Sequence, residues 1–181
     1  KSNEFVKFFR NYILTLSNTV DKINLEKLYE AVNLISKTIK KNKFIYVCDY
    51  LKLIRTNTKF KPKVISLSSN HELISAISND LDYSKIFSYQ LESLAAKGDL
   101  LILISSSGNS KNIREVLKFC NKKKLKTIGF SNFSGGYLAK NSNISIHCKI
   151  DNYGIAEDIN HILMHLLMQF IAKSNLNTKK K

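Results

Sequence analysis

The sequence predicts an α/β fold, a doubly wound five-stranded parallel sheet flanked by helices, with an N-terminal helical hairpin. Five short apolar runs, each of the length of a buried strand, are separated by stretches with helical periodicity. The chain has 181 residues, which suits one domain with a sizeable core. Its apolar content of 44% is ordinary for a globular protein and too high for a disordered one.

The first part of the chain, residues 1–42, predicts a pair of amphipathic helices ahead of any strand. Between residues 3 and 20, apolar side chains recur at every third or fourth position. Asn24 is a suitable N-cap for a second helix, whose broad apolar side extends over residues 25–39. We expect this helical hairpin to cover the sheet or to pack on another subunit.

Residues 43–174 alternate between strand and helix patterns. The expected strands are short, apolar and bounded by charged or turn residues, at 44–48, 64–67, 100–104, 127–130 and 144–147. The expected helices have apolar residues at helical spacing, at 70–77, 86–96, 112–122 and 156–173. The last helix is apolar on nearly every side, which predicts burial or a subunit interface. The basic tail 175–181 is expected to fray, and no linker divides 1–181, so we expect one domain.

The net charge of +15 comes from 29 basic and 14 acidic residues. Such a charge is typical of proteins that bind nucleic acid or anionic membranes. Only Arg10, Arg55 and Arg114 are arginine, however, and arginine is the residue favoured for bidentate contacts with phosphate and guanine. We therefore expect a solvated lysine-rich surface, disfavour nucleic acid as a partner, and leave a polyanion as the alternative. Any small ligand is expected to be an anion.

The location of the protein is indicated by its apolar runs and its cysteines. No run approaches the length of a membrane-spanning helix, and the N-terminus lacks the sequence pattern of a secretory signal. Cys48, Cys120 and Cys148 form no CxxC pair and no even framework, which is typical of a reducing compartment. We expect a cytoplasmic protein with no membrane partner.

Residues 105–110, Ser-Ser-Ser-Gly-Asn-Ser, follow the strongest strand and lead into a helix. Open parallel sheets bind ligands beyond the carboxyl ends of their strands. Hydroxyl groups, free N–H groups and the positive end of a helix dipole would converge there, and together they suit a phosphate. The alternative is a polar loop that ends in an ordinary N-cap. The loop has no Gly-Lys-Ser/Thr sequence, so it is not a nucleotide-binding Walker A loop.

The run from Gly98-Asp99-Leu100 through Ser110 resembles the signature of the SIS (sugar isomerase) fold, in which an apolar strand and the sequence S-x-S-G-N-S bind a phosphosugar. Further stretches resemble the phosphoheptose isomerase branch of that family: Asn79-Asp80, Ile86-Phe87-Ser88, Gly135-Gly136 and the final helix with its histidine. The resemblance covers nearly the whole chain. It implies a homo-oligomeric (dimeric or tetrameric) isomerase that converts sedoheptulose 7-phosphate to a heptose 7-phosphate, a precursor of lipopolysaccharide.

The resemblance also implies a role for each site residue. The implied phosphosugar-binding residues are Ser105, Ser106, Ser107, Ser110, Asn79, Asp80 and Glu157, with Asn109 shaping the turn. On the last helix, His165 matches a catalytic base and metal ligand, and Glu157 stands where the family has a glutamine. Asp49 is the nearest match to the family's second acid–base group. If zinc is bound, the resemblance implies His165, Glu157 and Asp49 as its ligands, and it implies no nucleotide cofactor.

The four histidines have alternative interpretations. An aldose–ketose isomerase moves a proton between C1 and C2 of the sugar, and histidine suits this task because it titrates near neutral pH. A lone histidine in an apolar helix, such as His165, is more often a core residue, and Asp49 is equally well a surface residue. His161 is expected to be structural, and the sequence identifies no partner for His71 or His147.

The chain departs from the family after its first strand. The family has a glycine-rich turn of the form C-G-N-G-G-S-A there, followed by a helix with a metal-binding histidine. In this sequence Cys48 leads directly to Asp49, and no glycine occurs between Lys1 and Lys97. Either the turn is deleted, which would leave a phosphosugar binder or an inactive paralogue, or the sequence omits a loop that the protein contains.

Two classes of function therefore remain open at the level of the sequence. The first is a phosphosugar isomerase with acid–base chemistry through an enediol. The second is a non-catalytic SIS module, either a sensor of a phosphosugar or a degenerate paralogue. A sensor would carry a separate DNA-binding domain, whereas this chain begins with a pair of amphipathic helices.

Overall fold

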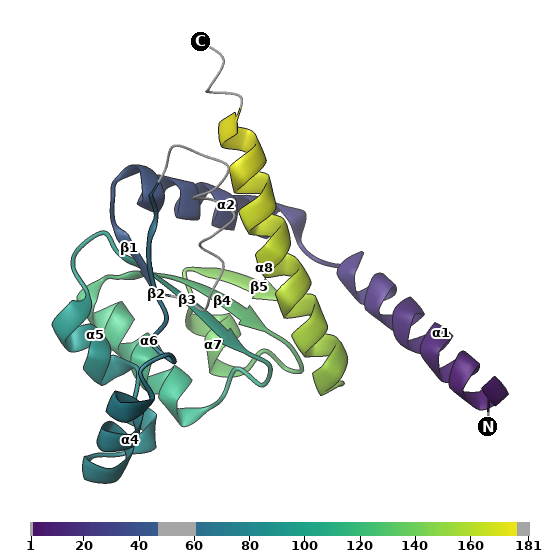
Figure 1. The fold of residues 1–181 in the computed structure, drawn as a ribbon, viewed down its shortest axis with the longest axis horizontal. Helices are drawn as coiled ribbons and strands as arrows, with labels where there is room; N and C mark the ends of the chain where they lie inside the picture. Colours follow the sequence, from purple (N-terminus) through teal and green to yellow (C-terminus); the bar gives the residue numbers. More distant parts are fainter. Residues whose placement is uncertain (1, 47–60, 177–181) are drawn as a thin grey trace.

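The structure, a computed structural model, describes residues 2–46 and 61–176. Its centre is a five-stranded parallel sheet in the order β2-β1-β3-β4-β5 (Figure 1). The strands are β1 (Phe44–Tyr46), β2 (Lys63–Ile65), β3 (Leu100–Ser105), β4 (Lys126–Ser131) and β5 (Ile144–His147). All five predicted strands are confirmed, and so are the α/β class and the parallel arrangement.

Helices connect and flank these strands. They are α1 (Ser2–Val20), α2 (Leu25–Lys40), α4 (His71–Asp80), the 3-10 turn η1 (Tyr83–Lys85), α5 (Ser88–Leu94), α6 (Lys111–Lys123), α7 (Gly136–Asn141) and α8 (Tyr153–Leu176). The predicted helix 86–96 is shorter than expected and ends at Leu94. The Asp99 carboxylate accepts a hydrogen bond from the Ala96 N–H at 2.8 Å, which turns the chain out of the helix before Gly98. The short helix α7 was not predicted.

The side chains of the strands alternate between two helical layers. Leu100 and Ile102 of β3 face the core formed with α2 and α8, whereas Leu101 and Leu103 face the core formed with α5, α6 and α7. This alternation is what a strand with both faces buried requires, and it explains why β3 is the longest continuous apolar run. Figure 1 shows α2 and α8 covering the same side of the sheet.

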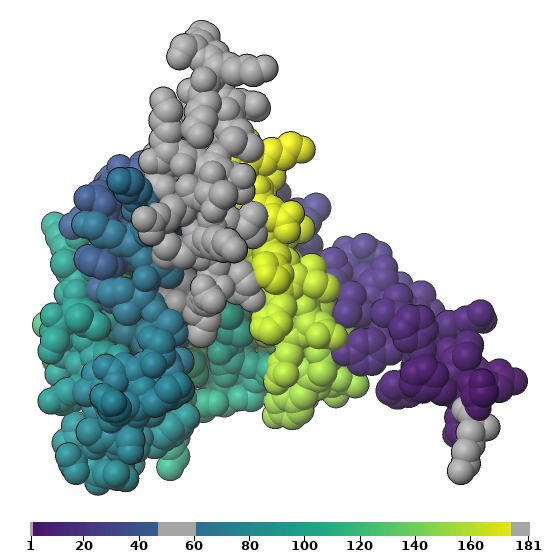
Figure 2. Space-filling view, in the orientation of Figure 1, coloured from purple at the N-terminus to yellow at the C-terminus, as the bar shows by residue number. Residues whose placement is uncertain are grey.

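The N-terminal helical pair is present, and its two members differ in their packing. Helix α2 buries a full side against the sheet and α8, including Ala31 and Ile35. Helix α1 packs against the core only through Tyr12, Leu16 and Val20 near its end, and its start projects from the body as an arm (Figures 1 and 2). The expected hairpin is therefore open, because α1 does not fold back along α2.

Some of the sequence predictions fall on residues that the structure does not describe. Cys48, Asp49 and the question of the glycine-rich turn lie outside the described residues, as do residues 177–181 of the tail. Among the helices that the structure describes, none combines the length and the apolar character that crossing a bilayer needs.

Candidate functional site

The topology of the sheet places a crevice at the carboxyl ends of β1 and β3. The chain passes from β1 to β2 on one side and then returns to β3 on the other side, so the direction of winding reverses between β1 and β3. Ligands of doubly wound sheets bind at this switch point, beyond the carboxyl ends of the strands. Ser105 is the last residue of β3, and the serine loop (residues 105–110) therefore begins at this crevice.

Gly108 allows the serine loop to turn back tightly. Its backbone has a φ of +64°, and its N–H donates to the Ser105 carbonyl at 3.1 Å and to the Ser105 Oγ at 3.2 Å. A Cβ at this position would overlap the carbonyl oxygen of Gly135. Both the positive φ and this close approach require glycine.

The serine loop is held from outside by the segment that follows β4. Asn132 donates its N–H to the Ser106 carbonyl at 2.9 Å, and Leu138 donates to the Gly108 carbonyl at 3.0 Å. The Asn109 side chain accepts the Tyr137 N–H at 3.0 Å, so it shapes the turn as expected. These bonds fix the backbone of the loop. They use the carbonyls of Ser106 and Gly108 and the side chain of Asn109, and they do not use the hydroxyls of Ser106 and Ser110.

The loop presents hydroxyl groups beside the start of α6. Ser105, Ser106 and Ser107 are half-buried, whereas Ser110 is exposed. Ser110 is the N-cap residue of α6, yet within the described part of the chain its hydroxyl makes no capping bond. In the first turn of α6 the Ile113 N–H donates to Asn112 Oδ1 at 2.9 Å, and the N–H groups of Lys111 and Asn112 have no acceptor within the helix. The positive end of the helix dipole lies at the same place. An oxyanion that only accepts hydrogen bonds fits this arrangement.

Helix α8 carries two further predicted residues, Glu157 and His165, and buried amides connect it to the serine loop. Asn160 donates from Nδ2 to Asn132 Oδ1 at 3.0 Å, and the backbone of Asn132 contacts Ser106 as described above. Glu157 and His165 are exposed on α8, on either side of Asn160 along the helix. The structure therefore connects α8 to the serine loop through Asn160, which the sequence did not single out.

Asn79 and Asp80 are exposed at the end of α4. The turn that follows them packs against α6 through η1. Hydrogen bonds from Ser84 lower the pKa of Asp82 in this turn, and the charge of Lys111 at the start of α6 lowers it further. No hydrogen bond between described residues joins Asn79 or Asp80 to the serine loop. The structure thus gathers the four serines and leaves the Asn-Asp pair on a neighbouring turn.

His147 has a partner that the sequence could not identify. Ser105, Ser131 and His147 end three adjacent strands and lie opposite one another in register. The Oγ of Ser131 lies 3.1 Å from Nδ1 of His147, and the imidazole packs over Gly135 beside the serine loop. The sequence does place all three residues at the ends of predicted strands. Only the strand register, which the structure supplies, shows that Ser131 and His147 lie side by side.

The residues present do not by themselves form a zinc site. In residues 2–46 and 61–176, no three His, Cys, Asp or Glu side chains cluster as metal ligands would. Glu157 and His165 supply two of the three expected donors, and the third, Asp49, lies outside the described residues. A structural zinc site takes four ligands and a catalytic one takes three plus water.

Comparison with curated proteins finds relatives that are named phosphoheptose isomerases. A probable phosphoheptose isomerase of Thermoplasma acidophilum is 36% identical over 107 residues, which are 59% of this chain and 59% of the relative. Phosphoheptose isomerase 2 of Campylobacter jejuni is 44% identical over 74 residues, which are 41% of this chain and 37% of the relative. The chain thus spans less than two thirds of the length of these relatives.

Solved structures share the fold. A phosphoheptose isomerase from Francisella tularensis superposes with a TM-score of 0.80 at 20% identity, covering 94% of this chain and 97% of that protein. The NanR protein of Vibrio vulnificus, solved with ManNAc-6P, superposes with a TM-score of 0.60 at 15% identity, covering 94% and 64%. The sequence model of the SIS domain matches residues 60–172, from β2 to α8. With that match over more than half of its length, the chain belongs to the SIS domain family.

Proposed function

We propose that this chain is a phosphosugar aldose–ketose isomerase that converts sedoheptulose 7-phosphate to a heptose 7-phosphate. The observation that carries the proposal is the serine loop, in which a fixed backbone and the hydroxyls of Ser106 and Ser110 meet the start of α6 at the switch point of the sheet. The names of the curated relatives support the same substrate. A phosphate is the ligand that such a loop is best suited to hold.

In the proposed reaction the protein holds the phosphate end of the sugar and moves a proton at the other end. Ser106 and Ser110 donate hydrogen bonds to phosphate oxygens, with the start of α6 stabilising the negative charge. From the ketose, His165 removes a proton from C1 while an acid–base partner protonates the C2 carbonyl oxygen, which gives the enediol. The enediol then takes up a proton at C2 and loses its O1–H proton, so that the carbonyl group forms at C1. We propose Asp49 as that partner, and Asn79, Asp80 and Glu157 as contacts of the sugar hydroxyls.

Zinc is a separate question, because the described residues offer only two of its expected ligands. Each proposed step of the reaction therefore uses only groups of the chain itself. Removal of divalent metal with a chelator tests whether the third donor, Asp49, completes a site: a loss of activity that zinc restores would support it, and unchanged activity would contradict it. The imidazole and carboxylate donors named above suit zinc by their chemistry.

The catalytic assignment is tested by replacing His165 and, as the matched control, His161. Both histidines are exposed on α8, one turn apart. His165→Ala is expected to lower kcat for sedoheptulose 7-phosphate by about 100-fold or more, the usual effect of removing an acid–base group. His161→Ala is expected to leave kcat within about threefold. A His165→Ala variant with full activity would contradict the assignment.

A phosphosugar-binding module without catalysis is the second candidate. One structural neighbour, the NanR protein, was solved with the phosphosugar ManNAc-6P, which favours binding as the common property of the fold. Tight binding of sedoheptulose 7-phosphate with no aldose product over hours would support a sensor or a degenerate paralogue. Product formation at a rate that depends on His165 would exclude it.

We further propose that the protein is a cytoplasmic homo-oligomer, a dimer or tetramer. Helix α1 exposes six large apolar side chains, among them Phe8, which is 66% exposed. Helix α8 exposes Ile162, Leu166 and Phe170. A groove of about 530 Å³ separates α1 from the segment before α8 and would admit a helix of a second copy. The cysteines that the structure describes, Cys120 and Cys148, are buried free thiols, as suits a reducing compartment.

A further inference from the structure

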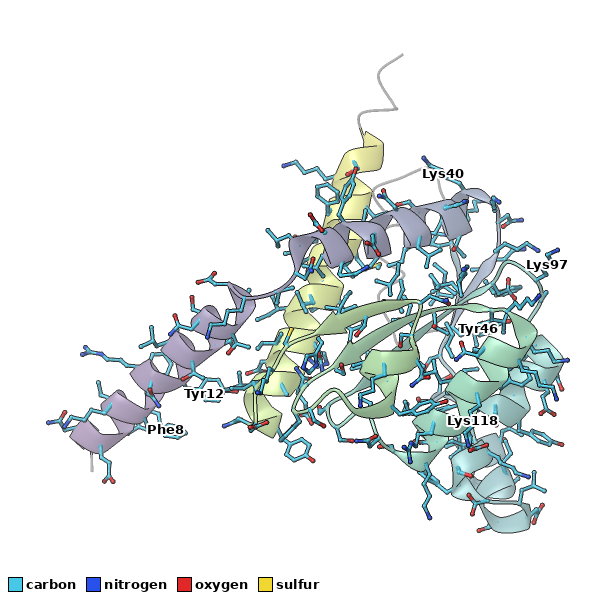
Figure 3. All side chains as sticks on the ribbon, turned by 180° about the vertical axis from the view of Figure 1, so that it is seen from behind. Phe8, Tyr12, Lys40, Tyr46, Lys97 and Lys118 are labelled. Atoms are coloured by element: carbon cyan, nitrogen blue, oxygen red, sulfur yellow. The ribbon has the colours of Figure 1, made fainter. Side chains whose placement is uncertain are left out.

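A second concave site lies on the outer side of α6, and the proposed isomerase reaction makes no use of it. Three segments form this outer groove: η1, α6 and α7. It is lined by Ser84, Lys111, Arg114, Glu115, Lys118 and Tyr137. Its volume of about 360 Å³ falls within the range of pockets that hold small molecules. Figure 3 shows Lys118 on α6, on the side of the molecule away from α8.

The charged groups of the outer groove favour an anion. Lys111, Arg114 and Lys118 follow one another at three and four residues, so they share one face of α6. Among the described residues, Glu115 pairs with Lys118 at 2.7 Å, and no carboxylate pairs with Arg114. Asp82 acts on Lys111 at the other end of the groove. Within the described chain, Arg114 is therefore a groove cation that makes no salt bridge, although the Glu115 carboxylate lines the same groove.

Arg114 is also held in place by an aromatic ring. Its guanidinium lies over the ring of Tyr137, 5.2 Å from the centre of the ring. The Tyr137 backbone is itself fixed by Asn109, as described for the serine loop. The ring contact uses the π face of Tyr137 and no hydrogen-bond donor of Arg114, and the fork of N–H groups of a guanidinium matches the oxygens of a phosphate. Stacking thus lowers the entropy that Arg114 would lose on binding.

We propose that the outer groove is a second anion site, in which Arg114 and Lys118 bind the phosphate of a small phosphorylated metabolite. This phosphate is distinct from the one that the serine loop would hold. The two sites are neighbours, because the backbone N–H of Arg114 donates to the Ser110 carbonyl at 3.0 Å in the first turn of α6, and the backbone N–H of Tyr137 donates to Asn109 Oδ1 at 3.0 Å. Occupancy of the groove therefore changes the affinity of the serine loop, and by linkage the reverse also holds.

The test is calorimetric titration with inorganic pyrophosphate at constant ionic strength, using the full chain and three double variants. The loop variant is Ser106→Ala/Ser110→Ala, and the groove variant is Arg114→Gln/Lys118→Gln. The control, Lys122→Gln/Lys123→Gln, removes the same charge from the last turn of α6. Circular dichroism melting confirms that each variant is folded.

We expect two sites per chain in the parent protein and in the control. The groove variant should retain only the site of the serine loop, and the loop variant should retain the groove site with an affinity changed by less than about tenfold. A groove variant that titrates like the control would overturn the proposal. A loop variant that titrates like the parent, beside a groove variant that binds nothing, would support the groove and contradict the serine loop as the phosphate site of the proposed function.

Discussion

At the scale of single residues, two glycines with positive φ lie at opposite ends of β3, and only Gly108 lies in the serine loop. Substituting each in turn distinguishes the effect of backbone strain on stability from its effect on ligand binding. Gly108 (φ +64°) would place a Cβ against the Gly135 carbonyl, whereas Gly98 (φ +96°) would place one 3.2 Å from the flexible side chain of Lys43. Gly108→Ala is expected to cost about 1–3 kcal/mol of backbone strain and to weaken phosphosugar binding more than tenfold, because the loop must shift. Thermal melting and titration with sedoheptulose 7-phosphate measure the two effects.

Gly98→Ala is the control for that substitution. It introduces a similar strain of about 1–3 kcal/mol at the amino end of β3, far from the serine loop. It should therefore lower the melting temperature while leaving phosphosugar affinity unchanged. Equal losses of affinity in the two variants would show that the loop geometry has no special part in binding.

Two buried thiols and one buried phenol are expected to make the stability of the protein fall at high pH. Burial raises the pKa of Cys120 to about 12 and that of Cys148 to about 11, and burial followed by the Asp99 carboxylate raises the pKa of Tyr46 to about 12. In the unfolded chain these thiols and this phenol lose their protons near pH 9 and pH 10. From about pH 9 upwards the unfolded chain therefore binds fewer protons than the folded one, so the free energy of unfolding falls as the pH rises.

Urea unfolding at several pH values between about 8 and 11 measures this dependence. The contribution of the neutral thiols is fully present below about pH 9 and is lost as the pH passes through the raised values. A Cys120→Ala/Cys148→Ala variant should show a shallower decline over the same range. A parent protein whose stability is constant from pH 8 to 11 would contradict the burial of these groups.

At the scale of elements, one buried amide pair links α8 to the segment that follows β4. Asn160 and Asn132 are 3% and 0% exposed, so a substitution of one leaves the other without its partner in a site closed to water. Asn160→Leu is expected to cost about 1–3 kcal/mol and to weaken phosphosugar binding, because Asn132 also positions the carbonyl of Ser106. Asn33→Leu, at an exposed position of α2, should do neither.

Helix α1 is the element that the proposed oligomer would use for contact with a second copy. Phe8 and Phe9 are 66% and 55% exposed on α1, and Phe8 (labelled in Figure 3) contacts the ring of Tyr12 on the same helix. Substituting them therefore removes little packing within one chain. Phe8→Glu/Phe9→Glu is expected to shift the protein to smaller species in sedimentation velocity. The variant should still unfold cooperatively on heating, which would show that the sheet is intact. Lys7→Glu introduces the same acidic group on the same helix and should leave the mass unchanged. A monomeric parent protein would contradict the proposed oligomer.

The strands could be predicted from sequence, whereas several connections could not. Runs such as 100–104 are apolar on both faces, and only a central parallel strand buries both faces. Helix α7 begins at Gly135-Gly136, where glycines are required by contacts with Asn109 and His147 rather than by helix propensity. The sequence also could not predict that α1 projects from the body of the molecule. A helix with one apolar side is expected to be covered, but its sequence does not identify the surface that covers it.

At the scale of the whole molecule, the parallel sheet separates hydroxyl groups from much of the positive charge. The helices run against the strands, so the ends of α2 and α6 lie at the amino edge of the sheet, where lysine is favoured by the helix dipole. Lys40, Lys97 and Lys124 stand at that edge, next to the starts of β1, β3 and β4. Figure 3 shows Lys40 and Lys97 at the same end of the molecule. The carboxyl edge instead carries the neutral serine loop.

The site was predictable to the extent that it is local in sequence. The serine loop is continuous from 105 to 110, and its place after a central strand sufficed to indicate an anion site. The links from this loop to α8 and β5 join residues far apart in the chain, through Asn132–Asn160 and Ser131–His147. Such pairs depend on strand register, which composition and periodicity do not determine.

The most direct test of the central claim is the initial rate of aldose formation from sedoheptulose 7-phosphate by the parent chain and by Ser106→Ala/Ser110→Ala. We predict turnover by the parent chain and a rise in KM of about tenfold or more in the variant, since each hydroxyl lost to a charged phosphate weakens binding by about 1.5–3 kcal/mol. The parent chain should also bind the sugar phosphate in competition with inorganic phosphate. A parent chain that neither binds nor converts the sugar, or a variant with an unchanged KM, would contradict the account.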